Sequence, residues 1–104
     1  MELQQIRYFL AVCAERSFTR AAKRCGVSQP SLTNGIKTLE KELGGDLFTR
    51  RPNIAVTQLG AAVRPHLMRT VLHAEKALKI ARSMRSMSVA PVRAAGNEPP
   101  STSI

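Results

Sequence analysis

The sequence has few acidic residues, few cysteines and no long apolar run. Its 104 residues include 16 Lys and Arg but only 7 Asp and Glu, which gives a formal net charge of +9. Such an excess favours a polyanionic partner, nucleic acid first and an anionic membrane surface second. No apolar stretch is long enough to cross a membrane. Two cysteines, Cys13 and Cys25, cannot form a disulfide framework, and we expect them to be buried core residues rather than redox sensors.

Several kinds of site are also missing. The N-terminus shows no basic and apolar leader of the secretory type, so a cytoplasmic location is expected. The length leaves no room for a barrel enzyme, and neither a nucleophile motif nor a phosphate-cradling glycine loop is present. His66 and His73 lie two helical turns apart, which is too far for one metal ion. We therefore expect no enzymatic activity, no metal and no cofactor.

The chain is expected to be mainly α-helical and to divide into three parts. Residues 1–57 combine helical and turn signals, and residues 58–87 have the pattern of one long helix. Residues 88–104 contain three prolines and a glycine without any periodicity, which predicts a disordered tail.

Apolar residues spaced three or four apart predict a first helix over residues 3–15. This apolar stripe consists of Leu3, Ile6, Leu10 and Cys13. A second, short helix is expected over residues 20–25. Thr19 would be its N-cap, and Gly26 would end it in a left-handed conformation.

The third predicted helix has the clearest boundaries, because Ser28 is a natural N-cap, Pro30 falls in the first turn and Gly44 follows the last apolar residue. Its apolar face consists of Leu32, Ile36, Leu39 and Leu43, and its opposite face of Pro30, Asn34, Lys37 and Lys41, with Thr33 beside them. Two helices joined by a tight glycine-containing turn predict a helix-turn-helix. An ordinary three-helix bundle is the alternative, but polar side chains of this kind can bond to base edges.

A β-wing is expected after the third helix. Leu47-Phe48 and Ile54-Ala55-Val56 are short β-prone runs, and Arg51-Pro52-Asn53 forms the turn between them. The arginines would then lie near the tip of the wing. A plain surface hairpin is the alternative.

The long helix is expected to start after Thr57, its N-cap, and to dimerise. Its seam repeats at steps of four and three and consists of Leu67, Val71, Ala74, Leu78 and Ala81. Because the seam is short and contains two alanines, the first helix is expected to contribute to the dimer as well. A helix packed back on its own domain is the alternative.

The sequence resembles the N-terminal DNA-binding region of LysR-type transcriptional regulators over residues 3–87. The segments that carry the resemblance are Ala21-Ala22, Val27 through Thr33, Ile36, Leu39-Glu40, Leu43-Gly44, Leu47-Phe48, Arg50 and Thr57 through Gly60. The resemblance implies a winged helix-turn-helix, a dimerising linker helix and binding to imperfect inverted repeats. The sequence departs from the family at Gly35, where a longer side chain is usual, at Cys25, where leucine is usual, and in a wing about one residue shorter.

Expected DNA contacts lie on the third helix and the wing. Gln29 and Asn34 can pair with adenine, and Lys37 can donate to guanine. The full set expected to contact DNA is Thr19, Ser28, Gln29, Pro30, Ser31, Thr33, Asn34, Lys37, Arg50 and Arg51. For Thr19 and Ser28, helix capping competes with a phosphate contact.

These patterns predict a sequence-specific transcriptional regulator of LysR type that lacks the effector domain. It would bind double-stranded DNA as a homodimer, without a membrane and without a small-molecule effector. Two alternatives remain open. One is a non-specific basic DNA-binding or architectural protein, and the other is a module that dimerises with full-length relatives and modulates them.

Overall fold

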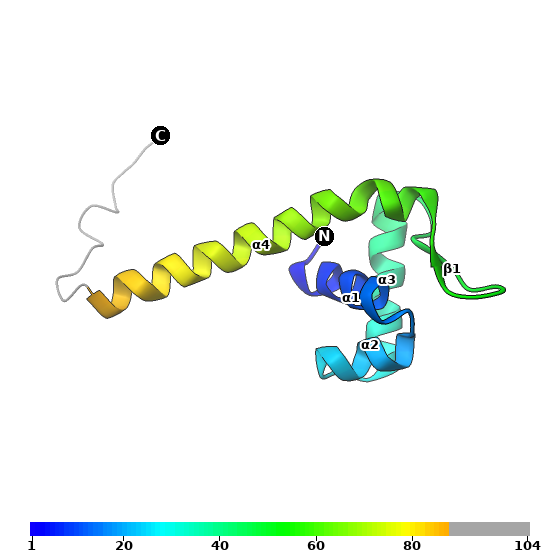
Figure 1. Ribbon diagram of the computed structural model, residues 1–104, viewed down its shortest axis with the longest axis horizontal. Coiled ribbons are helices and arrows are strands. Elements are labelled where there is room, and N and C mark those ends of the chain that lie inside the picture. Colours follow the sequence, from blue (N-terminus) through cyan, green and yellow to red (C-terminus); the bar gives the residue numbers. More distant parts are fainter. Residues whose placement is uncertain (88–104) are drawn as a thin grey trace. The chain divides into compact units, whose positions relative to one another are not determined.

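The computed structural model describes residues 1–87, which contain four helices and one two-stranded sheet. In chain order the elements are α1 (Leu3–Glu15), α2 (Phe18–Cys25), α3 (Gln29–Leu43), β1 (Phe48–Thr49), β2 (Ala55–Val56) and α4 (Gln58–Met87). They form the predicted winged helix-turn-helix followed by a long helix (Figure 1). The tail predicted for residues 88–104 lies outside the described residues.

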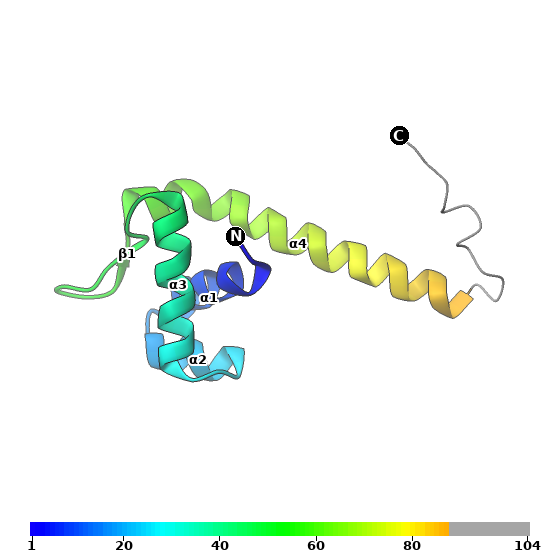
Figure 2. The ribbon, with the colours of Figure 1, turned by 180° about the vertical axis from the view of Figure 1, so that it is seen from behind.

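Helix α1 packs against both α2 and α3, which also contact each other. Figures 1 and 2 show α1 crossing α3. Phe9 and Val12 have no exposed surface, and Ile6 has almost none. The predicted apolar stripe therefore does not coincide with the centre of the buried face, since Leu3 is 38% exposed and Leu10 is only half-buried. Helices on two sides of α1 bury a broader face than a single contact would.

Helix α2 begins two residues earlier than predicted, and the N-cap expected at Thr19 is wrong. Ser17 is the N-cap, and its Oγ accepts a hydrogen bond of 3.0 Å from the Arg20 N–H. Ser17 has an extended backbone, as an N-cap requires, whereas Thr19 lies inside the first turn and is exposed. The predicted end is confirmed, because Gly26 has φ 71° and closes the helix in the left-handed region.

Helix α3 has the predicted boundaries and the predicted buried face. The Ser28 Oγ accepts a hydrogen bond of 3.2 Å from the Ser31 N–H, and Gly44 ends the helix with φ 87°. Three apolar side chains of this helix are fully buried, namely Leu32, Ile36 and Leu39. The opposite face is therefore the one left for a partner.

Gly35 lies on the side of α3 that packs against Tyr8 of α1. A Cβ atom at this position would lie 2.6 Å from Cδ2 and 2.8 Å from Cε2 of Tyr8. The Tyr8 ring, which is 7% exposed, thus fills the space that a side chain at residue 35 would need. Glycine in a helix interior costs about 1 kcal/mol relative to alanine, and here the close packing of two helices offsets that cost.

The wing is a short antiparallel pair, as predicted, with Phe48 opposite Val56 and Thr49 opposite Ala55. Leu47 precedes β1 instead of belonging to it, and its side chain is fully buried. Thr57 is the predicted N-cap of α4, because its Oγ1 accepts a hydrogen bond of 3.0 Å from the Gly60 N–H.

The first part of α4 completes the core of a unit formed by residues 1–73. Leu67 and Val71 are 6% and 7% exposed and belong to the same buried cluster as the apolar side chains of α1 and α3. The division expected at residue 57 therefore marks the start of a helix, while the packed core extends into that helix.

The described part of the second unit, residues 74–87, continues α4 with its apolar side chains exposed. Leu78, Ile80 and Met84 are each about half exposed, at 52%, 51% and 52%. On a helical wheel Leu78 lies about 120° from Met84 and about 160° from Ile80, so these apolar side chains are spread around the helix. Leu78 and Ala81 lie about 60° apart, and Lys79 and Ser83 lie on the side opposite Ala81.

The contact between Gly35 and Tyr8 predicts an unusual response to mutation. We expect Gly35→Ala to lower the free energy of unfolding by about 1–3 kcal/mol through overpacking, although alanine favours helix. In a Tyr8→Leu background the same replacement should be neutral or stabilising. Urea denaturation of the four proteins measures both effects. An equal loss from Gly35→Ala in both backgrounds would show that the ring is not the cause.

Candidate nucleic-acid interface

The outward face of α3 brings together most of the residues predicted to contact DNA. Gln29, Pro30, Ser31, Asn34 and Lys37 are all exposed. The sequence had placed Thr33 beside them, and its side chain is half-buried, so it presents less surface than its neighbours. The face thus combines amide, hydroxyl and ammonium groups, all of which can bond to base edges or phosphates.

Ser28 is occupied by its capping role. Its Oγ accepts from the Ser31 N–H and also lies 3.0 Å from the Ser31 Oγ, to which its hydroxyl donates. A phosphate contact at Ser28 would have to share or replace the bond to the Ser31 hydroxyl. Capping is therefore the interaction that the structure assigns to this residue.

Both predicted arginines of the wing are exposed, and they differ in their surroundings. Arg50 follows β1 directly, and its guanidinium carbon lies 4.5 Å from the centroid of the Phe18 ring. Arg51 has no recorded ring contact or ion pair within residues 1–87. One arginine is thus held against α2 and the other extends freely from the wing.

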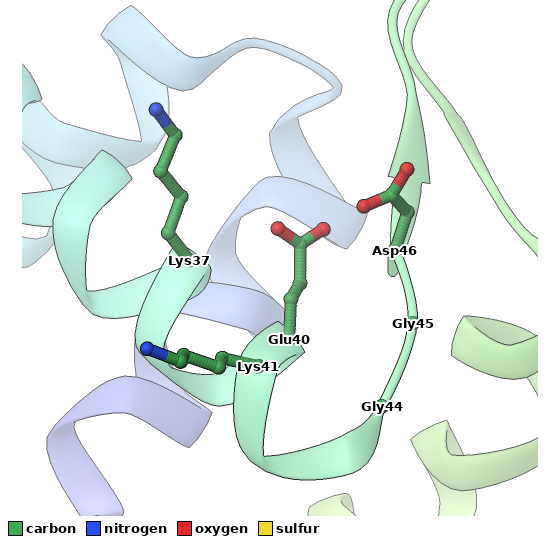
Figure 3. A pocket seen from close by; sticks show the side chains of 6 residues that line it. All are labelled: Lys37, Glu40, Lys41, Gly44, Gly45 and Asp46. Atoms are coloured by element: carbon green, nitrogen blue, oxygen red, sulfur yellow. The ribbon is translucent and has the colours of Figure 1, made fainter.

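An open hollow joins α3 to the wing. Its lining consists of Lys37, Glu40, Asp46, Phe48, Thr49 and Arg50. Of the residues predicted to contact DNA, Lys37 of α3 and Arg50 of the wing thus border the same hollow. A hollow on the adjoining side is lined by Lys37, Glu40, Lys41, Gly44, Gly45 and Asp46 (Figure 3).

Two carboxylates in these hollows were missed as site residues by the sequence reasoning. Figure 3 shows Lys37 and Lys41 extending from α3, with Glu40 on the side of the helix that faces Asp46. The Glu40 carboxylate accepts a hydrogen bond of 2.8 Å from the Leu47 N–H. Glu40 belongs to the Leu39-Glu40 segment that carries the family resemblance, whereas Asp46 belongs to no motif; the two lie on either side of Gly44-Gly45 in the sequence.

Part of the positive charge near α2 is already paired. Arg24 forms an ion pair of 3.2 Å with Glu15, and the Arg20 Nε lies 3.6 Å from the same carboxylate. Both arginines are well exposed, so these pairs contribute little to stability. They nevertheless orient the two guanidinium groups toward the end of α1.

Thr19 lies in the first turn of α2 and is exposed. Because Ser17 is the N-cap, the Thr19 hydroxyl is not required for capping. Its predicted DNA contact stays a prediction.

The predicted dimer seam divides into two parts. Leu67 and Val71 are buried in the core of their own chain, so they offer little surface to a second chain. Ala74 is half-buried, whereas Leu78 and Ala81 are exposed. The alternative of a helix packed back on its own domain thus describes the first part of α4.

Other chemistry finds no support within residues 1–87. Burial raises the pKa of both thiols, Cys13 being buried and Cys25 half-buried, which lowers the reactive thiolate fraction. No group of three or more His, Cys, Asp or Glu side chains in this range is arranged to hold a metal ion. No helix in the same range is long and apolar enough to span a membrane.

Comparison with known proteins identifies the family. The model of the lysR family of bacterial regulatory helix-turn-helix proteins matches residues 3–61. The HTH-type transcriptional regulator BudR of Klebsiella aerogenes is 44% identical over 85 residues, which are 81% of this chain and 59% of the relative. IlvR of Caulobacter vibrioides is 37% identical over 86 residues, which are 82% of this chain and 29% of the relative. This chain belongs to the lysR family and spans only part of the length of these relatives.

Solved structures agree with that assignment. The BenM_DBD/catB site 1 DNA complex matches 83% of this chain and 98% of that chain, with a TM-score of 0.77 and 32% identity. The CbnR_DBD-DNA complex matches 82% and 99% of the two chains, with a TM-score of 0.73 and 34% identity. Full-length OxyR C199D from Pseudomonas aeruginosa has a TM-score of 0.76 and 34% identity, with 80% of this chain and 28% of that chain covered.

The revised N-cap of α2 can be tested directly. Ser17→Ala should lower the free energy of unfolding by about 1 kcal/mol, because the Arg20 N–H loses its acceptor. Thr19→Ala, the matched hydroxyl deletion two residues away, should change it by less than about 0.5 kcal/mol. Urea denaturation followed by circular dichroism ranks the two variants. The reverse ranking would restore Thr19 as the cap.

Proposed function

We propose that this chain binds double-stranded DNA in a sequence-specific manner and regulates transcription as the DNA-binding part of a LysR-type regulator. The observation that carries the proposal is the division of α3 into two faces. Leu32, Ile36 and Leu39 are fully buried, and the exposed face carries Gln29, Ser31, Asn34, Lys37 and Lys41. A solvated helix surface needs no such set, whereas base edges require donors and acceptors of this kind.

Base reading would come from the first turns of α3 in the major groove. Gln29 and Asn34 are exposed and have amides that can bond bidentately to adenine. Lys37, one turn further along, can donate to guanine. Pro30 and Ser31 lie between these positions and would fix the approach of the helix to the bases.

Binding strength would come from cations on the wing and from the hollow beside it. Arg50 and Arg51 would contact phosphates or the minor groove. Lys37 and Arg50 border the same hollow, which fits a DNA backbone passing between the recognition helix and the wing. The net charge of +9 supports strong, salt-dependent attraction to any duplex.

Dimerisation is proposed to use the second part of α4. Leu78 and Ala81 of the predicted seam are exposed there, beside Ile80 and Met84. Two chains related by a two-fold axis would present two winged domains to an imperfect inverted repeat. In this proposal the chain acts in the cytoplasm, catalyses no reaction and binds no small-molecule effector.

Selection of bound duplexes from a random pool tests the proposed function. Emergence of an inverted repeat is the expected result. Recovery of random sequences with similar affinity would instead support the non-specific, architectural alternative. Mixed dimers with full-length relatives, formed without binding to any selected duplex, would support the modulator alternative.

Separate variants should distinguish base reading from anchoring. Asn34→Ala is expected to relax preference at one base position and to cost about 1–3 kcal/mol there. Arg50→Ala should weaken all sequences by similar factors and lower the salt slope by about one. Binding isotherms on selected and scrambled duplexes at several salt concentrations measure both effects. If Asn34→Ala weakens both duplexes equally, Asn34 does not read a base.

The dimer surface can be probed with a matched pair of charges. Leu78→Glu should shift the protein toward monomer, because a carboxylate buried in an apolar seam has no partner. Ser83→Glu adds the same side chain on the side of the helix opposite Ala81 and should leave the association constant nearly unchanged. Sedimentation equilibrium with and without DNA compares them. A wild-type protein that stays monomeric under both conditions would refute this dimer.

A further inference from the structure

Three phenylalanine rings form a continuous support beneath the wing. The rings of Phe9 and Phe48 have centroids 5.4 Å apart and an interplanar angle of 43°. Those of Phe48 and Phe18 are 5.9 Å apart, at 76°, which is an edge-to-face contact. All three side chains are buried, and Phe48 of β1 links the ring of Phe9 in α1 to that of Phe18 in α2.

The Phe18 ring also contacts a cation. The Arg50 guanidinium carbon lies 4.5 Å from the Phe18 centroid, within the range of about 6 Å for a cation–π interaction. Phe18 is 7% exposed, whereas Arg50 is exposed. The ring is thus a fixed platform, and the arginine is the side chain that it orders.

This contact leaves the charge of Arg50 available. No ion pair of Arg50 is recorded within residues 1–87, although Glu40 and Asp46 line the same hollow. An aromatic face attracts a guanidinium group without neutralising it. An unsupported arginine would lose much rotamer freedom on binding a phosphate, and a pre-ordered one loses less.

We propose that Phe18 is a positioning residue that holds the Arg50 guanidinium in place for its contact with DNA. The inference rests on the proposed function, because it concerns how one of the anchoring cations reaches the duplex. Phe18 itself contacts no DNA in this arrangement. Phe18 acts on DNA binding only through Arg50, and it does not position the neighbouring Arg51.

A double-mutant cycle tests this role. Phe18→Leu keeps an apolar side chain but removes the aromatic face, and it should weaken binding of the selected duplex about two- to fivefold. In an Arg50→Ala background the same change should have no further effect. In an Arg51→Ala background, the matched control, the two- to fivefold loss should persist. Phe18→Tyr keeps the ring and should restore wild-type affinity.

Nuclear magnetic resonance tests the contact without DNA. In the wild type, the Arg50 δ-methylene protons should show an upfield ring-current shift that Arg51 lacks. The shift should vanish in Phe18→Leu and persist in Phe18→Tyr. This measurement on the wild type remains decisive even if Phe18→Leu fails to fold, and Phe18→Met then replaces it in the cycle.

The possible failures are distinguishable. Equal shifts for Arg50 and Arg51 in the wild type would overturn the contact. An undiminished loss from Phe18→Leu in the Arg50→Ala background would overturn the positioning role. If no consensus emerges from selection, a random-sequence duplex serves as the probe, because a phosphate contact does not depend on base identity. A wild-type protein that binds no duplex would refute the proposed function while the ring-current result still decides the contact.

Discussion

The backbone of Leu47 is the point on which the relative placement of recognition helix, wing and α4 depends. Its N–H donates to the Glu40 carboxylate of α3 at 2.8 Å, and its carbonyl accepts from the Thr57 N–H at 3.0 Å. Its side chain is fully buried, so the residue is held from three directions. A Cβ atom at Gly60 would lie 2.5 Å from the same carbonyl oxygen, which explains a glycine in the first turn of α4. The start of the wing is therefore joined to α3 by one hydrogen bond, to the start of α4 by another, and to the core by the Leu47 side chain.

Local patterns in the sequence were sufficient for the element boundaries of α1 and α3. Capping residues and apolar spacing act over a few residues, and Ser28 and Gly44 have the conformations that those rules require. The cap of α2 could not be ranked in the same way, because Ser17 and Thr19 are both good N-caps. In the structure Ser17 caps the helix, and the buried Phe18 is its first residue.

Other features depend on contacts between distant segments and left no local signal. The seam of α4 has heptad spacing along its length, but the first unit buries Leu67 and Val71 and leaves Leu78 exposed. Periodicity identifies which side of a helix is apolar, and it does not identify which chain covers that side. The Phe18 ring that contacts Arg50 likewise belongs to α2, which is far from the wing in sequence. Composition and spacing therefore predicted the position of the arginine but not its contact with this ring.

The close approach of α1 and α3 restricts how recognition specificity can be exchanged within the family. Residue 35 does not lie on the face of α3 that is proposed to contact DNA, because a side chain there would meet the Tyr8 ring. A recognition helix taken from a relative with a longer residue at this position would carry a steric mismatch together with its base-reading residues. Such a transplant requires a smaller residue at position 8 as well. Residues 8 and 35 must therefore be exchanged together, although they belong to different helices.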